Sequence, residues 1–265
     1  MKIALLISTF NWPEALDLVL RSVVRQSRLP DEVLIADDGS DERTGALIDC
    51  YAGRLPIKHV WHEDEGFRKT IVLNKAIQQA TSPYIIEIDG DIVLHRHFIK
   101  DHLKAAERGY FVQGSRAMIG ERKTAQALAN KQLDFSFFTK EITCGRFNAI
   151  RCPKLSGIFH TDSLSSRKVK GCNLAFWRAD YIKVNGYYNG FEGWGWEDTE
   201  FGERLINAGI RKNRLKWAAV GYHLFHRLSP RSNFEPNKQI YEESVTHKLA
   251  YRGPGYRQTP SPVTV

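Results

Sequence analysis

In the first third of the sequence, short apolar runs alternate with segments whose apolar residues recur at helical spacing. The apolar runs predict strands, and the helical spacing predicts helices between them. Strand and helix alternating in this way favour the α/β class, with a mainly parallel sheet and helices on both of its faces. The expected strands are 2–9, 32–40, 57–61 and 84–89, and the expected helices are 13–24, 41–53 and 69–80.

The second half of the chain has a less regular pattern. Residues 141–170 are expected to form a long loop, 170–191 a strand followed by a helical turn, and 197–210 a helix. The C-terminal stretch 252–265 is polar and rich in Pro and Gly, so we expect it to be disordered.

Length and composition indicate a soluble globular protein. The chain has 265 residues, 42% of them hydrophobic, so it can bury a sizeable core. Its longest apolar runs are far shorter than the roughly 18 residues that span a bilayer, and the N-terminus lacks the pattern of a secretory signal. We therefore expect a cytoplasmic protein, and the four cysteines, which have no zinc-like spacing, fit reduced thiols there. The formal net charge of +8 suits an anionic ligand, nucleic acid or an acidic membrane surface.

Two acids stand at the end of the fourth expected strand, Asp89 and Asp91, with Gly90 between them. Residues two apart on a strand point to the same side, so the two carboxylates are expected to converge at the carboxyl rim, where such sheets bind ligands. Two like charges held that close need a cation, and Mg²⁺ and Mn²⁺ bind carboxylate oxygens and substrate phosphates. Gly90 would let a bulky ligand approach the backbone. The same three residues also fit an ordinary turn after a strand.

Several stretches carry a resemblance to known families. "STFNWPEALDLVLRSVVRQS", "VLIADDGSDE" and "IDGD" occur in the order and spacing of the N-terminal signature of family-two glycosyltransferases with the GT-A fold. Further on, "GWGWEDTEF" is similar to a segment in the C-terminal region of the β-1,4-galactosyltransferases. The resemblance implies a GT-A type, Rossmann-like sheet flanked by helices, with a C-terminal acceptor-binding subregion.

The resemblance also implies a division of the chain. Residues 1–120 would form the nucleotide-sugar-binding half of one domain, and 121–230 would form its acceptor-binding and catalytic half. Residues 231–265 would form a C-terminal extension.

In the resembled family, the ends of the first two strands hold the uracil and ribose of a UDP-sugar. The residues that this places at the nucleoside are Thr9, Asn11, Asp37 and Asp38. Acids and amides can form hydrogen bonds with the imide of a base and the hydroxyls of a ribose. Asp89 and Gly90 are expected to contact the same donor.

Basic residues stand at the start and in the first turns of the expected helix 69–80. Arg68, Lys69 and Lys75 are candidates for binding the diphosphate, because a helix N-terminus also favours anions. A solvated surface charge is the alternative for each of them.

A cation bound by one aspartate and two phosphate oxygens would still lack ligands. The segment "VGYHLFHRLSPR" supplies His223 and His226. The resemblance implies that Asp91 and His226 bind the metal, with His223 where the family has a second soft ligand. Because Mn²⁺ accepts imidazole more readily than Mg²⁺ does, we expect Mn²⁺, with Mg²⁺ as the alternative.

The stretch "FEGWGWEDTEF" combines flat side chains with acids. Trp194 and Trp196 would stack on a sugar ring of the acceptor, although a pair that fills the core is the alternative. Glu197 and Asp198 open a helix, where the dipole would keep a carboxylate ionised. The resemblance implies that Asp198 is the catalytic base and that Glu197 binds the acceptor.

Together these expectations describe an inverting, metal-dependent glycosyltransferase. It would move one hexose or N-acetylhexosamine from a UDP-sugar to a glycan acceptor in the synthesis of a bacterial-type surface polysaccharide or lipopolysaccharide. A sugar-binding module without turnover and a sugar nucleotidyltransferase are the alternatives, although the chain has no Gly-rich run with a Lys for a triphosphate. Nucleic-acid binding is not expected, because the basic residues are spread along the chain. Their charge would allow peripheral contact with the inner face of the membrane.

Overall fold

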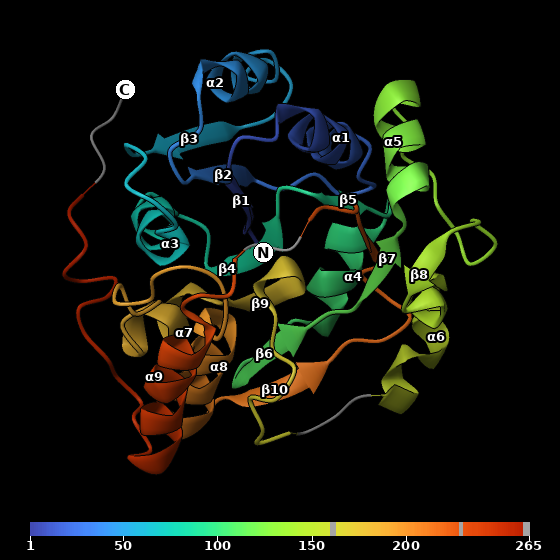
Figure 1. Ribbon diagram of the computed structural model, residues 1–265. Helices are drawn as coiled ribbons and strands as arrows, with labels where there is room; N and C mark the ends of the chain where they lie inside the picture. Colours follow the sequence, from blue (N-terminus) through green and yellow to red (C-terminus); the bar gives the residue numbers. More distant parts are fainter. Residues whose placement is uncertain (160–162, 228–229, 262–265) are drawn as a thin grey trace.

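The structure, a computed structural model, describes residues 1–159, 163–227 and 230–261 (Figure 1). Within these residues the protein folds around a seven-stranded sheet. In spatial order its strands are β10 (Arg211–Arg214), β6 (Tyr110–Gln113), β9 (Leu174–Trp177), β4 (Tyr84–Asp89), β1 (Ile3–Thr9), β2 (Glu32–Asp37) and β3 (Ile57–Trp61). The last four run parallel to one another, which confirms the strands expected in the first third of the sequence.

Helices cover both faces of this sheet (Figure 1). On one face lie α1 (Pro13–Val24) and α2 (Glu42–Asp49), and on the other lies α3 (Lys69–Gln78). Alternate residues of β1 explain the arrangement, because successive side chains of a strand point to opposite faces. Leu5 and Ile7 pack in the same core cluster as α1, whereas Ala4 and Leu6 pack in the cluster that contains α3.

The strand β9 makes the sheet mixed. It pairs antiparallel with both β4 and β6, while β6 and β10 are parallel to each other. With α7 (Arg178–Lys183), β9 confirms the strand and helical turn expected in 170–191. The backbone of this strand carries the second half of the chain back to the edge of β4.

A second, four-stranded sheet was not expected from the sequence. Its spatial order is β5 (Ile92–Leu94), β11 (Gly221–His223), β7 (Arg116–Ile119) and β8 (Ile142–Cys144). The expected long loop 141–170 is therefore wrong in part, because it contains β8 and the short helices η1 (Arg146–Ala149), α6 (Pro153–Ser156) and η2 (Gly157–Phe159). Elements of three or four residues are too short to show a period in the sequence.

The remaining helices complete the second half. They are α4 (Phe98–Ala105), α5 (Glu121–Asn130), η3 (Gly171–Asn173), α8 (Glu197–Asn207) and α9 (Phe234–Thr246). The chain end is folded as far as it is described, since Gln78 of α3 donates hydrogen bonds to the backbone carbonyls of Tyr256 and Thr259 at 2.9 Å. The disorder expected for 252–265 is thus wrong for 252–261, and 262–265 lie outside the described residues. None of the described helices has the length and apolar character needed to cross a bilayer.

Candidate active site

Asp89 ends β4 and faces a lysine. Its carboxylate accepts hydrogen bonds from Lys69 Nζ at 2.7 Å and from Ser8 Oγ at 3.1 Å. Burial would raise the pKa of Asp89, but the charge and hydrogen bond of Lys69, together with the charges of His223 and Arg116, lower the pKa to about 2. Asp89 is therefore an anion that the protein itself has already paired.

Gly90 is required by the protein's own backbone. Its N–H donates to the carbonyl oxygen of Ser8 at 2.7 Å, and a Cβ added to Gly90 would lie 2.9 Å from the same oxygen. The end of β1 therefore approaches this glycine closely, which is a reason for a glycine here beside the expected contact with a ligand.

Asp91 lies beyond the strand and faces two histidines. Since β4 ends at Asp89, the strand alternation that would bring the two acids side by side does not reach Asp91. Asp91 Oδ2 lies 3.4 Å from His226 Nε2 and 3.7 Å from His223 Nε2. The three ligand atoms lie within 4.8 Å of one another, so the fold brings the expected metal ligands together.

The protonation of both histidines fits a metal site. His223 Nδ1 lies 2.8 Å from the carbonyl oxygen of Leu224, and His226 Nδ1 lies 2.7 Å from that of Arg227. A carbonyl oxygen can only accept, so each Nδ1 donates its proton to the backbone and each Nε2 faces Asp91. Backbone carbonyls orient metal-binding histidines in the same way.

The two carboxyl oxygens of Asp91 have different surroundings. Its Oδ1 is buried and has no hydrogen-bond partner among the described residues. Burial, together with the charge of Asp89, raises its pKa to about 8. The pKa of His223 is lowered to about 4 by burial and by Arg116, so this ring is neutral near pH 7. One carboxyl group and two imidazole nitrogens are ligand types that fit a divalent cation, which would displace the proton of Asp91.

Lys69 lies in the field of four carboxyl groups from two distant parts of the chain. Burial would lower its pKa, but these groups raise it well above the usual value. In order of effect they are Asp89, Asp198, Glu197 and Glu87. The first residue of α3 therefore joins the rim at β4 to the start of α8.

Asp198 lies in the first turn of α8, against buried groups. The Tyr187 hydroxyl lies 3.4 Å from Asp198 Oδ1 and 3.1 and 3.0 Å from the two carboxylate oxygens of Glu87. Gly171 donates its backbone N–H to Asp198, and a Cβ on Gly171 would lie 2.6 Å from Oδ1. Burial raises the pKa of Asp198.

Glu197 corrects the expectation that the helix dipole keeps both acids fully ionised. Only 5% of its surface is exposed, and burial, together with the charge of Asp198, raises its pKa to about 7. Its Oε2 accepts the backbone N–H of Gly195 at 3.1 Å. Burial outweighs the helix dipole because desolvation destabilises the ionised carboxylate by more free energy than the helix N-terminus stabilises it. Carboxyl groups with pKa values close to neutral can exchange protons with a substrate.

Asp37 and Asp38 are both held by histidines. Asp37 Oδ2 lies 2.9 Å from His59 Nε2, and Asp38 Oδ1 lies 2.7 Å from His62 Nε2. Asp37 has no exposed surface, and its Oδ1 accepts the backbone N–H of Ser40 at 2.9 Å. The expected direct contact of Asp37 with a nucleoside is not available in this arrangement, because the carboxylate is used to shape the loop after β2.

The end of β1 is tied to the same loop. The carbonyl oxygen of Thr9 accepts the N–H of Asp38 at 3.0 Å. Asn11 has a φ of 45°, and its Oδ1 accepts the N–H of Asp41 at 2.8 Å. Thr9, Asn11 and Asp38 thus share one rim, as the sequence predicts.

The expected diphosphate ligands point to different partners. The backbone N–H of Arg68 donates to Asp38 Oδ2 at 3.0 Å, while its guanidinium pairs with Glu65 on the adjoining loop. Lys75 Nζ lies 3.4 Å from His62 Nδ1, on the side of Asp38. Both residues therefore lie beside the loop after β2, and only the first lysine of α3 reaches the acids at β4.

Trp194 and Trp196 rest on α9 and are not equivalent. Trp196 stacks on Tyr241 with ring centroids 5.1 Å apart, and Trp194 stacks on Phe234 with centroids 6.0 Å apart. Trp196 is half-buried and has a φ of 74°, whereas Trp194 is 37% exposed. The core-filling alternative fits Trp196 better, and Trp194 keeps more surface for a sugar.

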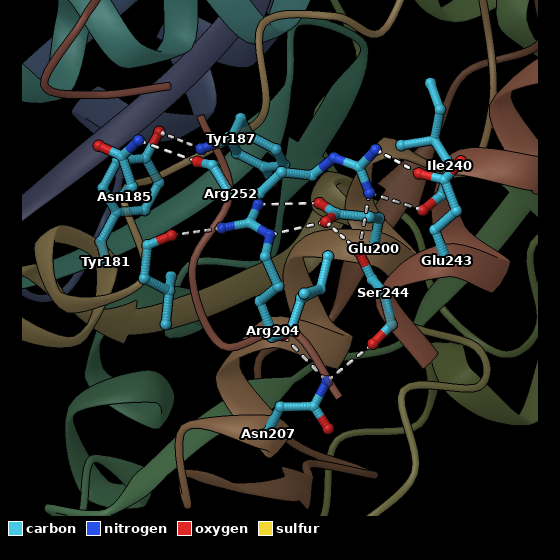
Figure 2. Close-up of polar contacts among 12 residues, drawn as sticks. Tyr181, Asn185, Tyr187, Glu200, Arg204, Asn207, Ile240, Glu243, Ser244 and Arg252 are labelled. Carbon is cyan, nitrogen blue, oxygen red and sulfur yellow. Dashed lines mark hydrogen bonds and ion pairs between the residues drawn. The ribbon is translucent and has the colours of Figure 1, made fainter. Parts of the chain in front are cut away.

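A buried polar network holds α8 against α9 and the chain end (Figure 2). Arg204 and Glu200 are both fully buried and form an ion pair within α8 at 2.7 Å. Ser244 of α9 donates to Glu200 at 2.8 Å, and Arg252 donates to Ser244 at 3.3 Å. Asn207 of α8 also donates to the backbone carbonyls of Ser244 and Leu249, so the helix that begins with the two candidate catalytic acids is tied to the C-terminal extension.

Four residues of the site were missed by the sequence analysis: Glu87, Arg116, Gly171 and Tyr187. An acid inside the apolar run of β4 was a signal for Glu87. Arg116 donates to Cys172 Sγ at 2.8 Å, and its charge acts on both Asp89 and Asp91. Gly171 and Tyr187 carry no local pattern, because their role depends on contacts between distant segments.

Two family descriptions match the chain. "Glycosyl transferase family 2" matches residues 4–165, and "N-terminal domain of galactosyltransferase" matches residues 160–227. The first match contains the strand ends that form the rim, and the second contains the acids of α8 and both histidines.

Named proteins with similar sequences include enzymes that transfer sugars. The chondroitin synthase of Escherichia coli is 25% identical over 83% of this chain and 34% of its own length. Validoxylamine A glucosyltransferase of Streptomyces hygroscopicus subsp. limoneus is 28% identical over 83% of this chain and 52% of its own length. The chain thus spans about a third and about half of the length of these two relatives.

Solved structures show the same fold. S. aureus TarS 1-349 in complex with UDP has a TM-score of 0.65 at 15% identity, over 94% of this chain and 68% of that chain. The mannosyltransferase PcManGT from Pyrobaculum calidifontis, in complex with GDP-Man and Mn²⁺, has a TM-score of 0.57 at 16% identity, over 93% of this chain and 62% of that chain.

Proposed function

Because the chain belongs to glycosyl transferase family 2, we propose that it moves one sugar from a UDP-sugar to a hydroxyl group of a glycan, using a divalent cation. The observation that carries this proposal is that the candidate metal ligands and the candidate catalytic acids lie at the same edge of the large sheet. Asp91, His223 and His226 form a site fit for a cation, and Asp198 begins α8. Lys69 interacts with the acids on both sides.

The cation would stand on the leaving-group side of the reaction. When bound by Asp91 and the two histidines, Mn²⁺ or Mg²⁺ would offset the charge of the departing diphosphate. Two imidazole nitrogens favour Mn²⁺ over Mg²⁺. The Mn²⁺ complex of PcManGT supports a cation in this fold.

Asp198 is the proposed base, and Glu197 the proposed partner of the acceptor. The raised pKa of Asp198 makes it a stronger base than a surface carboxylate, while Lys69 keeps part of its charge compensated. A base placed opposite the diphosphate would activate the attacking hydroxyl directly. We therefore propose a single displacement that inverts the anomeric configuration, so that an α-linked donor gives a β-linked product.

The nucleoside of the donor would bind at the ends of β1 and β2. Thr9, Asn11 and Asp38 are the candidates, and Lys75 lies beside them. Asp37 would act indirectly, by holding the loop after β2 in place. The UDP complex of TarS supports a uridine nucleotide in this fold. A hexose or an N-acetylhexosamine would then extend from the rim towards Asp198 and Trp194.

We propose that the acceptor is an intermediate of a bacterial-type surface polysaccharide or lipopolysaccharide. The relative named chondroitin synthase supports a glycan acceptor. A protein with a net charge of +8 would be attracted to the acidic inner face of the membrane, which also fits the expected cytoplasmic location.

A donor screen that measures UDP release tests the proposal. We expect one UDP-sugar to be consumed when Mn²⁺ and a glycan acceptor are present, and turnover to stop in excess chelator. Full turnover in chelator would contradict the role of the cation. Tight sugar binding with no UDP release from any donor would favour a sugar-binding module, and pyrophosphate release from UTP and a sugar phosphate would favour a nucleotidyltransferase.

A further inference from the structure

The most exposed large apolar side chains are concentrated in one part of the chain. Among the described residues, the four with the highest exposure all lie within 121–170. They are Phe138, Ile158, Leu164 and Phe147, which are 85%, 74%, 67% and 64% exposed. Single exposed apolar residues are common, but their concentration in one segment indicates an interaction surface.

Most of the net positive charge lies in the same segment. Residues 121–170 contain ten Lys and Arg and four Asp and Glu, which gives a formal charge of +6 out of +8 for the whole chain. The rest of the chain therefore carries only +2. A partner for this segment should be both anionic and able to accept apolar side chains.

Three aromatic rings of the segment form a cluster of defined geometry. The ring centroid of Phe137 lies 5.4 Å from that of Phe138 and 5.6 Å from that of Phe147. The Arg146 guanidinium donates to the backbone carbonyls of Phe137 and Thr139 at 2.8 and 2.9 Å, which fixes the loop. Phe137, Phe138 and Phe147 are called here the aromatic cluster; Phe138 and Phe147 are exposed to solvent, and Phe137 is half-buried between them and the hydrogen-bonded loop.

A cationic groove adjoins the aromatic cluster. Its volume is about 430 Å³, and it lies between α5 and the loop 136–141. Arg122, Lys123 and Lys140 line it, and Glu141 pairs with Arg122. The lining supplies more positive than negative charge, which suits a phosphate-bearing headgroup.

We propose that the aromatic cluster and the cationic groove dock the protein on an anionic lipid bilayer. The rings would enter the headgroup region, and the cations would bind lipid phosphates. Apolar rings beside Lys and Arg are the combination that binds a membrane interface, where each kind of group finds its partner. The inference rests on the proposed function in placing the acceptor at a membrane, but lipid binding is measured without turnover.

The docking face and the candidate metal site share the small sheet. β8 pairs with β7, and β7 pairs with β11, which ends at His223. Figure 1 shows α5 and β8 along one edge of the molecule. Docking through this edge would hold the catalytic rim at a fixed height over the lipid surface.

Flotation with lipid vesicles tests the proposal. We expect the full chain to float with vesicles of phosphatidylcholine mixed with phosphatidylglycerol, not with phosphatidylcholine alone, and to be released as salt screens the charges. Phe138→Ser with Phe147→Ser should weaken vesicle binding at least about tenfold, because each ring loses its apolar burial. Lys123→Glu with Lys140→Glu should weaken it by a similar factor.

Matched variants outside the segment serve as controls. Leu29→Ser removes an exposed apolar side chain and Lys100→Glu reverses an exposed charge, and neither should change vesicle binding. UDP binding, measured by calorimetry in all variants, shows whether the donor site is intact. If the protein without substitutions does not bind UDP, the proposed function is contradicted, but the result on lipid binding is not affected.

Two exposed cysteines offer a direct probe of orientation. Cys144 ends β8, shortly before Phe147 in the sequence, and Cys50 follows α2. With Cys152→Ser and one of these cysteines replaced by Ser, a polarity-sensitive fluorophore can be attached to the other. We expect vesicles to increase the emission at Cys144 and to leave that at Cys50 unchanged.

Three outcomes would overturn the proposal. They are no flotation with anionic vesicles, flotation that the two double variants do not weaken, and an equal fluorophore response at Cys144 and Cys50. A raised KM for a soluble glycan in the double variants, without any vesicle binding, would instead assign this face to the acceptor.

Discussion

Neighbouring acids of this site have very different pKa values because each faces a different partner. Burial would raise the pKa of Asp89, but Lys69, with the more distant charges of His223 and Arg116, lowers it to about 2. Two residues further on, burial and the charge of Asp89 raise the pKa of Asp91 to about 8. A proton and a metal cation therefore compete for the carboxyl group of Asp91.

This competition predicts how pH changes stability. A carboxyl group whose pKa is raised on folding stabilises the fold below its ordinary pKa of 3.8, and this contribution is lost as pH rises through about 8. In chelator we expect the thermal midpoint to fall between about pH 5 and pH 8, and to fall less in Asp91→Asn. Mn²⁺ should raise the midpoint more at the higher pH.

Differential scanning fluorimetry with and without Mn²⁺ checks both parts of this prediction. Asp49→Asn, at the end of α2, is the matched control, and it should respond to Mn²⁺ as the unaltered protein does. A Mn²⁺ effect that persists in Asp91→Asn with His226→Ala would place the cation elsewhere.

Asp198 is predicted to act only once the substrate is bound. Asp198→Asn should keep the fold and UDP binding, and should lower kcat by ~10² to 10⁴, which is the usual contribution of a positioned base. Steady-state kinetics and calorimetry with UDP measure the two effects. Glu203→Gln, one turn further along α8, should leave kcat unchanged. Near-normal kcat in Asp198→Asn, or an α-linked product by NMR, would remove Asp198 from this role.

At the scale of elements, α9 supports the tryptophans of the loop before α8. Trp196→Ala should lower the free energy of unfolding by about 3 kcal/mol, because it empties the contact with Tyr241 and Phe234. Trp194→Ala should change stability little and raise the acceptor KM about tenfold, by loss of stacking on a sugar. Urea unfolding measures the effect on stability, and acceptor kinetics measure the effect on KM. Equal effects of the two variants on KM would show that Trp194 and Trp196 have the same role.

The ion pair inside α8 is predicted to be costly to break. Arg204→Met should lower the free energy of unfolding by about 3 to 5 kcal/mol, since it leaves Glu200 buried without its partner. Adding Glu200→Leu should restore most of this loss, because no buried charge then remains. Urea unfolding measures both variants. A double variant less stable than Arg204→Met would show that Glu200 stabilises the fold through contacts other than its ion pair with Arg204.

At the scale of elements, the sequence predicts well those helices and strands whose apolar pattern repeats over many residues. α1, α3 and the four parallel strands repeat their apolar residues over enough positions to be recognised, and all are confirmed. β5, β8 and β11 have three residues each, so their pairing is decided by distant partners. The packing of 252–261 likewise depends on α3, and not on its own Pro-rich and Gly-rich composition.

Across the whole molecule, residue types were predicted better than partners. Asp91, His223 and His226 meet as expected, because strand ends and a histidine pair leave a clear signal. The partners of Asp37 and Asp38 were not foreseen, since His59 and His62 lie on or beside another strand. Burial, which sets most pKa values here, is a property of the assembled fold and has no local pattern.

The position of Lys69 has a consequence for kinetics. One ammonium group compensates acids that belong to both the donor side and the acceptor side, so these groups bind and release protons as a set. The two limbs of a pH–rate profile will then report macroscopic constants of the whole cluster. Asp89→Asn should shift the limb that would otherwise be assigned to Asp198, because Lys69 then has one fewer acid to neutralise.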